Sequence, residues 1–264
     1  MSIFKKVHNA GIWQTIETII NVFAQFLYMA IMARILNKSD FGLMAIANSL
    51  IVSGYIFAQS GMGFALIQRK NITYKHINAA LQGGVVVGIM LFLIFFFLAP
   101  SITNFFEQPE LENIIKIIAI NFLVVSISAV SLGILQKQFR FKEQSIVTIL
   151  SVILSYSFGI FLGVRGFGVW SLVLASLLLS VLKAIGFFHF AKIKLAKGLF
   201  LKEWRELFSF GFGIMLLQIN NYIGKSGIML VLGKIFNPTL LGVFERTFTI
   251  KTLPSSYIGN ILDA

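Results

Sequence analysis

Long apolar stretches recur along the chain and set the strongest limit on its fold. The purest of them, VVVGIMLFLIFFFLA at residues 85–99, contains no charged side chain. About 20 such residues cross a bilayer as a helix, and a helix satisfies its own backbone hydrogen bonds in lipid. Over the 264 residues 57% are apolar and only 12% are charged, too few to cover a water-soluble fold. We therefore predict an all-α polytopic membrane protein and exclude soluble enzymes, disordered chains and secreted disulfide scaffolds.

Eight stretches are expected to be membrane-spanning helices, separated by turn-forming residues. We place them at residues 11–35, 42–65, 79–99, 114–135, 146–164, 168–188, 207–232 and from about 240 onward. The expected breaks between spans include Pro100, Pro109, Gly166 and Pro238.

Basic residues are concentrated in every second loop. The N-terminus, residues 69–75, residues 137–142 and residues 192–205 hold most of the Lys and Arg, and the loops between them hold few. Cytoplasmic loops are enriched in Lys and Arg, so the N-terminus is predicted to be cytoplasmic. This topology accounts for most of the net charge of +12, and nucleic acid is not an expected partner.

The chain shows no pattern for a cofactor, a metal or a disulfide. It contains no cysteine, its three histidines are isolated in loops or at the membrane surface, and no phosphate-binding or dinucleotide fingerprint is present. We therefore predict no cofactor.

Two segments 200 residues apart share one pattern. Residues 34–43 (RILNKSDFGL) and 234–243 (KIFNPTLLGV) both read basic, Ile, apolar, Asn, any, hydroxyl, any, apolar, Gly, apolar. Six expected spans separate them, so both copies point the same way. This predicts a parallel repeat about an axis along the membrane normal, as in many transporters.

The repeat also predicts how the chain is organised. A complete six-helix lobe is expected over residues 1–188, an amphipathic cytoplasmic linker over 189–206, and the first two helices of a second lobe over 207–264.

Several motifs resemble one family when taken in order. They are ARIL at 33–36, DFGL at 40–43, GMGFALIQ at 61–68, GFGVWSLV at 166–173 and LGVFERTFTIKTLP at 241–254. Together they are similar to the O-antigen and exopolysaccharide flippases of the multidrug/oligosaccharidyl-lipid/polysaccharide exporter superfamily.

The resemblance implies a fold and an activity. The expected fold is a MATE-like bundle of two six-helix lobes in a bacterial inner membrane. The expected activity is movement of a polyprenyl-diphosphate-linked oligosaccharide between leaflets, in a pathway with glycosyltransferases and a polysaccharide polymerase. Because the chain ends near its eighth span, we expect a truncated member.

One face of the first span is polar. Gln14, Glu17, Asn21 and Gln25 follow one another at spacings of three and four residues, which places them on one side of a helix. They are expected either to line a cavity for sugar hydroxyls or to form hydrogen bonds between helices, worth about 1 kcal/mol each. For Glu17 we favour an ion or proton site, because a buried carboxylate is costly.

Cations of the second lobe are the candidates for the anionic headgroup. Lys225, Arg246 and Lys251 lie within expected spans, and Gln218 and Asn221 add polar groups to the same cavity face. Arg binds phosphate through two parallel hydrogen bonds, and Lys binds it as a point charge.

A competing interpretation treats some basic residues as anchors. Arg246 and Lys225 can extend to the membrane surface, or one of them can pair with Glu245. For Lys183, near the inner end of the sixth span, and Lys116, near the outer end of the fourth, we prefer such an anchoring role, with a position facing the cavity as the alternative for both.

Other functions are weighed against the flippase. A multidrug or cation antiporter of the same fold would need more acidic groups in the membrane than Glu17 and Glu245. A membrane enzyme would need a larger loop than residues 100–113, so we do not expect an enzyme. A truncated fragment without activity is the further alternative.

Overall fold

The computed structural model describes residues 3–59, 62–69, 71–196, 198–209, 211, 213, 232, 239–244, 246 and 247. Within these residues all regular secondary structure is helical, as predicted. The helices are α1 (Ile3–Ile35), α2 (Lys38–Gln59), α3 (Met62–Gln68), α4 (Tyr74–Phe106), α5 (Leu111–Ile118), α6 (Ile120–Lys137), α7 (Phe141–Val164) and α8 (Val169–Ala191). A further helix covers residues 201–209.

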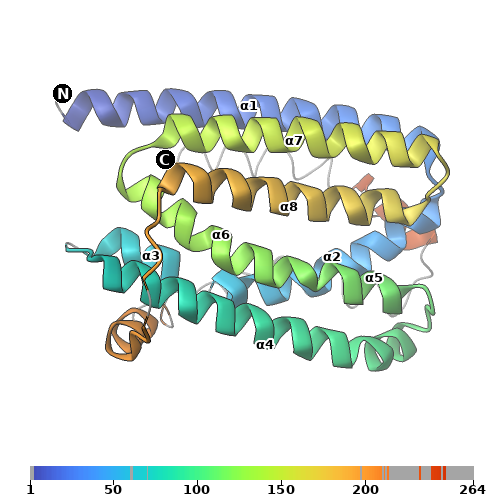
Figure 1. Cartoon of the computed structure of the whole chain (residues 1–264). Coiled ribbons are helices and arrows are strands. Elements are labelled where there is room, and N and C mark those ends of the chain that lie inside the picture. The colour runs from blue at the N-terminus through green and yellow to red at the C-terminus, as the bar shows by residue number, and fades with distance from the viewer. Residues whose placement is uncertain are drawn as a thin grey trace.

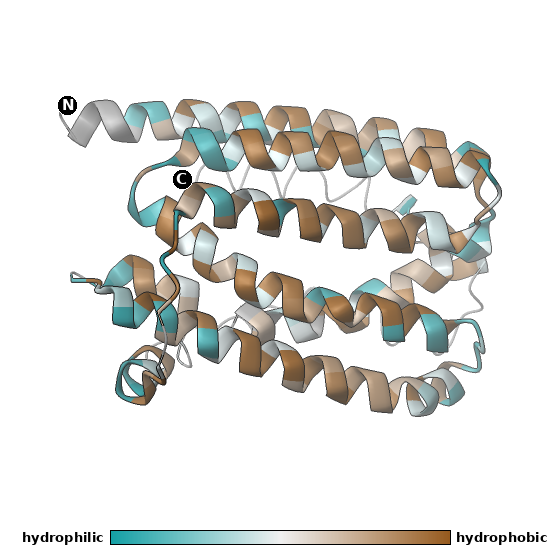
Figure 2. Ribbon diagram, in the orientation of Figure 1, coloured by the Kyte–Doolittle hydropathy of each residue, from teal (hydrophilic) through white to brown (hydrophobic). Residues whose placement is uncertain are grey.

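The long helices lie side by side and alternate in direction along the chain (Figure 1). In the part of the chain that the structure describes, five helical segments are long and apolar enough to cross a membrane: His8–Ile35, Tyr74–Phe106, Leu111–Lys137, Phe141–Val164 and Val169–Ala191. α2 has 22 residues, about 33 Å at the usual helical rise, and connects the same two ends of the bundle. Figure 2 shows that hydrophobic residues dominate the middle of the bundle and that hydrophilic residues gather toward its ends.

Three of the expected spans differ in detail from the structure. The span expected at 42–65 consists of α2 and the short α3, and the span expected at 114–135 consists of α5 and α6. At the junction of α5 and α6, Phe122 N–H donates to Ala119 O at 3.0 Å, which is a tighter turn than that of an α-helix. The prediction that Pro100 ends the third span is wrong, because α4 continues through it to Phe106.

The end of α4 is set by backbone geometry instead of by proline. Pro100 lacks an N–H group and so removes one helical hydrogen bond, but the flanking turns persist. The helix stops where Glu107 adopts a positive φ of 56° and donates its N–H to Asn104 O at 3.3 Å.

Small residues bring α4 and α6 into close contact. A Cβ added at Gly84 would lie 3.0 Å from Ser126 O, and one added at Gly88 would lie 3.1 Å from Phe122 O. The glycines therefore let the two helix backbones approach directly, as small residues four apart do in membrane helices.

The loops at one end of the bundle are joined by Asp40. Its Oδ2 accepts a hydrogen bond from Asn37 N–H at 3.0 Å, and its Oδ1 accepts one from Val169 N–H at 3.1 Å. The second bond brings a carboxylate to the N-terminus of α8, where the helix dipole favours negative charge. Asp40 thus ties the α1–α2 turn to the α7–α8 turn.

The two copies of the repeat meet at this same end. A Cβ added at Gly242 would overlap the carbonyl oxygen of Lys38 and would lie 3.0 Å from Gly42 N. Leu241, beside it, is fully buried in the core that also contains Leu36 and Phe41. Gly42 and Gly242 occupy equivalent positions in the two sequence segments. The rotation axis expected between the segments stays a prediction.

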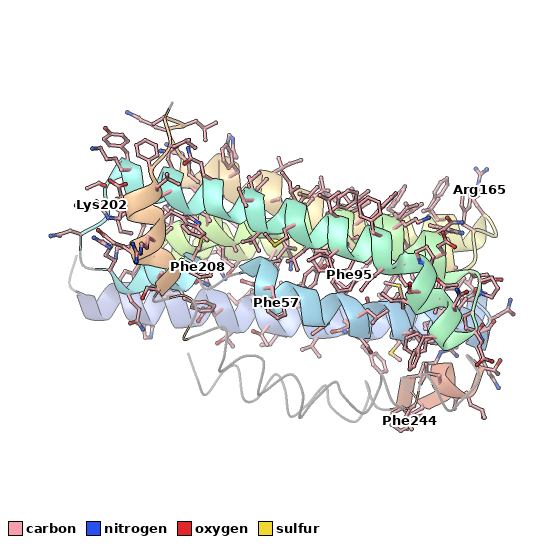
Figure 3. The ribbon with its side chains drawn as sticks, turned by 90° about the horizontal axis from the view of Figure 1, so that it is seen from below. Phe57, Phe95, Arg165, Lys202, Phe208 and Phe244 are labelled. Atoms are coloured by element: carbon pink, nitrogen blue, oxygen red, sulfur yellow. The ribbon has the colours of Figure 1, made fainter. Side chains whose placement is uncertain are left out.

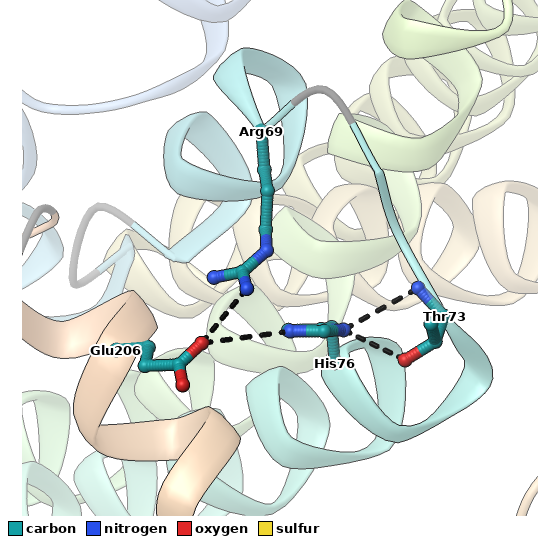
Figure 4. Close-up of polar contacts among 4 residues, drawn as sticks. All are labelled: Arg69, Thr73, His76 and Glu206. Atoms are coloured by element: carbon teal, nitrogen blue, oxygen red, sulfur yellow. Dashed lines mark hydrogen bonds and ion pairs between the residues drawn. The ribbon is translucent and has the colours of Figure 1, made fainter.

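The chain after α8 docks against the opposite end of the lobe. Arg69 Nη2 donates to Glu206 Oε2 at 2.8 Å, and His76 Nε2 lies 3.8 Å from the same oxygen (Figure 4). His76 Nδ1 in turn accepts the Thr73 N–H at 3.3 Å. The hydrogen bond from Arg69 lowers the pKa of the Glu206 carboxyl, so this contact persists at neutral pH and is lost only as the pH falls through that lowered pKa.

The expected linker boundaries at 189 and 206 stay a prediction. α8 ends at Ala191, and residues 201–209 are already helical.

Gly242→Ala should destabilise the protein, because the added methyl group must displace the Lys38 carbonyl. We expect a loss of about 1–3 kcal/mol, seen as a fall of several degrees in the melting temperature of the detergent-purified protein. Gly11→Ala is the matched control, because a Cβ there meets nothing within 4 Å, and it should be neutral or stabilising. Equal melting temperatures for Gly242→Ala and the wild type would contradict the contact between the repeats.

Candidate functional site

A cavity of about 570 Å³ lies among α1, α2, α3, α6, α7 and α8; we call it the main cavity. Its wall carries two charged groups, three amides and several hydroxyls, although it lies within an apolar bundle. The polar residues of the wall are Glu17, Asn48, Tyr55, Ser128, Gln136, Gln144, Thr148, Ser176, Ser180 and Lys183.

Glu17 and Lys183 place opposite charges on one cavity. Glu17 comes from the N-terminal half of α1 and Lys183 from the C-terminal half of α8, and these two halves lie at the same end of the bundle (Figure 1). The two side chains interact electrostatically. Each charge thereby reduces the cost of burying the other away from water.

α7 supplies the polar groups around Glu17. Ser145 Oγ lies 2.8 Å from Glu17 Oε2 and 3.1 Å from Trp13 O, so its hydroxyl can donate to the carboxylate or to the backbone. Ser145 itself is fully buried. The neighbouring Gln144 Oε1 is also buried and accepts no hydrogen bond from the described residues. Such an acceptor can be satisfied by water or by a ligand in the main cavity.

A second cavity of about 240 Å³ continues from the main cavity toward the other end of the bundle. The two cavities share Asn48, Ser176 and Leu179 in their walls. One wall of the second cavity is formed by Tyr28 and Tyr156, whose rings stack at 4.3 Å with an interplanar angle of 8°. The two cavities therefore adjoin and lie one after the other along the bundle, with polar groups in otherwise apolar walls.

The polar face expected on α1 divides between the two cavities. Glu17 lines the main cavity and Gln25 lines the second. Asn21, between them on the helix, has a buried Oδ1 without a hydrogen-bond partner among the described residues. Gln14 is half-buried and lines neither cavity. Whether these four side chains contact a substrate stays a prediction.

Most candidates of the second lobe fall outside the described residues. These are Lys225, Lys251, Gln218 and Asn221. Arg246 is described, and its Cζ lies 3.7 Å from the centre of the Phe41 ring, a cation–π contact. Because Phe41 lines the second cavity, this contact places Arg246 next to the cavity wall.

Sequence reasoning missed part of the site. We preferred an anchoring role for Lys183, but it lines the main cavity. The available signal was the spacing of Ser176, Ser180 and Lys183, which puts all three on one face of α8. No comparable pattern marked Gln136 and Gln144, which flank the α6–α7 turn and enter the wall only through the packing of the helices.

The fold and its long apolar helices define a multi-pass helical membrane protein. The chain belongs to the family described as "Polysaccharide biosynthesis protein", whose model matches residues 31–264.

Several characterised proteins are similar to this chain. The teichuronic acid biosynthesis protein TuaB of Bacillus subtilis (strain 168) is 26% identical over 266 residues, which cover 99% of this chain and 54% of TuaB. The lipopolysaccharide biosynthesis protein WzxC of Escherichia coli (strain K12) is 22% identical, with 99% and 54% covered. The succinoglycan biosynthesis transport protein ExoT of Rhizobium meliloti (strain 1021) is 20% identical, with 89% and 47% covered. The chain thus spans about half the length of these relatives.

A solved structure shares the fold. An inward-facing multidrug resistance MATE family transporter of the MOP superfamily matches with a TM-score of 0.64 over 95% of this chain and 63% of its own length, at 15% identity. This similarity confirms the expected MATE-like all-α fold.

Cysteine accessibility should show whether water fills the main cavity. The chain has no native cysteine, so Ser180→Cys and Ile153→Cys each introduce one thiol. Ser180 lines the main cavity, whereas Ile153 is 48% exposed on the outer face of α7. Because the thiolate is the reactive form and needs water, we expect a charged methanethiosulfonate to modify Ser180→Cys at least about tenfold faster. Equal rates in membrane vesicles would contradict a wet cavity.

Proposed function

We propose that this lobe provides one wall of the path along which the oligosaccharide head of a polyprenyl-diphosphate-linked lipid crosses the membrane. The observation that carries this proposal is a pair of adjoining cavities with polar groups in their walls, Glu17 and Lys183 among them, inside a bundle whose outer surface is apolar. In this proposal the two cavities form the passage. The names of the relatives support the substrate class, since they refer to teichuronic acid, lipopolysaccharide and succinoglycan.

The chemistry of the passage suits such a head. Sugars expose many hydroxyl groups, and the amides and hydroxyls of the main cavity can donate to and accept from them. A diphosphate needs cations in a low-dielectric path, where unpaired charge is very costly. We assign Lys183 to this task in the first lobe, with Glu17 balancing its charge when no substrate is bound.

Arg246 is proposed to act beside this passage from the second lobe. Its stacking on Phe41 holds it next to the second cavity, and its planar guanidinium can bind a phosphate through two hydrogen bonds. Lys225 and Lys251 are proposed as further headgroup contacts on sequence grounds alone.

We extend the proposal to the membrane location, the orientation and the partner enzymes of the protein. The protein would lie in the bacterial inner membrane with a cytoplasmic N-terminus, and it would act with the glycosyltransferases and the polymerase of its pathway. It would be a transporter and not an enzyme.

Lys183→Gln should reduce surface polysaccharide when introduced into the chromosomal gene. Losing one charged hydrogen bond costs about 1.5–3 kcal/mol, so we expect roughly a 10- to 100-fold drop in output. Arg246→Ala should act in the same direction. The measurement is surface polysaccharide per cell, normalised to the amount of the protein in the membrane.

Lys116→Gln is the matched control, because Lys116 pairs with Glu112 at 2.6 Å and lines neither cavity. Polysaccharide output at the wild-type level in Lys183→Gln and Arg246→Ala would overturn the assigned roles. Clear drug resistance in a pump-deleted host, without an effect on polysaccharide, would favour the antiporter instead.

A further inference from the structure

The segment that leaves α8 is held in an extended conformation along the start of α4. Asn78 Nδ2 donates to Lys194 O at 3.0 Å, and Asn78 Oδ1 accepts from Ala196 N–H at 2.9 Å. One helical turn later, Gln82 Nε2 donates to Gly198 O at 2.6 Å, and Gln82 Oε1 accepts from Phe200 N–H at 3.4 Å. Two amide side chains thus bind the backbone of four alternate residues.

This attachment fixes which side chains point away from the lobe. In an extended chain successive side chains alternate in direction, and the leucines next to the attached positions are exposed. Leu195 is 73% exposed and Leu199 is 80% exposed, and Leu201, at the start of the next helix, is 69% exposed. Three neighbouring leucine side chains with such high exposed fractions form an exposed hydrophobic patch, which is unusual unless another apolar surface covers it.

Basic side chains surround these leucines. Lys75, Lys192, Lys194, Lys202 and Arg205 are all exposed. None of them forms an ion pair with another residue in the described part of the chain. Of the two nearby acids, Glu206 already pairs with Arg69 and Glu203 is half-buried. Glu206 also interacts electrostatically with Lys202, but five exposed cations face only these two acids, so the patch carries a net positive charge.

The patch lies at the level of one membrane surface. α4 has 33 residues, about 50 Å at the usual rise, which exceeds the roughly 30 Å hydrocarbon core. Its first turns, where Asn78 and Gln82 hold the extended segment, therefore reach the headgroup region. Figure 3 shows Lys202 at this end of the bundle and Arg165 at the opposite end.

We propose that residues 192–196 and 198–205 form an anionic-phospholipid site, with Leu195, Leu199 and Leu201 inserted among acyl chains and the surrounding Lys and Arg bound to lipid phosphates. The occupant is argued from charge complementarity, because exposed leucines beside unpaired cations match an anionic interface. The site would anchor the connection between the lobes to the membrane surface. It depends on the membrane location of the chain and not on the proposed flipping activity.

A fluorophore at position 199 tests this site directly. Leu199→Cys gives a single labelling position in this cysteine-free chain. The labelled full-length protein is reconstituted in phosphatidylcholine with a fixed fraction of phosphatidylglycerol, and the bromine quencher is carried on the acyl chains of one lipid or of the other. We expect brominated phosphatidylglycerol to quench several-fold better than brominated phosphatidylcholine at equal mole fraction.

Charge variants show whether the preference arises from the patch. The substitutions K192Q, K194Q and K202Q together should abolish it, since each charge near an anionic surface contributes roughly a fivefold preference. High salt should weaken it as well. The charge-matched control is R34Q, K38Q and R165Q at the opposite end, which also removes three positive charges and should leave the preference intact.

A second label separates lipid selectivity from simple exposure. Ile153→Cys on the lipid-facing side of α7 should be quenched equally by both lipids. Equal quenching by the two lipids at position 199, no quenching there at all, or a preference that survives the triple substitution would each overturn the site. Melting temperatures of all variants check that the fold is kept, and polysaccharide output reports separately on the proposed function.

Discussion

The structure depends on one constraint: polar groups within the bundle need partners that a bilayer does not supply. The chain meets it by separating an apolar outer surface from polar groups that face interior cavities. Glu17 and Lys183 face the same cavity, and Ser145 lies within hydrogen-bonding distance of Glu17. A carboxylate or an ammonium pointing into lipid would be far more costly, so the positions of these side chains explain how charged groups can lie within so hydrophobic a chain.

The two ends of the lobe are stabilised in different ways. At one end a single carboxylate, Asp40, joins two turns, and Gly242 packs on the backbone of α2 near Gly42. At the other end, amide side chains and the Arg69–Glu206 pair hold the segment that follows α8. At one end, therefore, Gly242 of the second repeat segment packs near Gly42 of the first. At the other end, the segment that follows α8 is attached to the rest of the bundle.

These contacts connect the family motifs to a physical role. DFGL and GFGVWSLV lie far apart in the sequence, but Asp40 of the first accepts a hydrogen bond from Val169 of the second. Gly242 of the LGVF segment packs against the backbone of Lys38 and Gly42, beside the first of these motifs, and the Arg246 guanidinium lies over the Phe41 ring. Residues that look like separate short motifs thus form one cluster beside the second cavity.

The sequence by itself determined the helical membrane fold, most span positions and the polar face of α1. Hydropathy and side-chain periodicity are local properties, and a bilayer makes them decisive because it leaves a helix few alternatives. Only the tertiary structure decided which polar residues share a cavity. Lys183 and Glu17 are 166 residues apart, and Gln136 and Gln144 follow no periodic pattern, so their convergence depends on how α1, α6, α7 and α8 pack. The continuation of α4 through Pro100 also needed the structure, because the neighbouring turns and not the proline set where that helix ends.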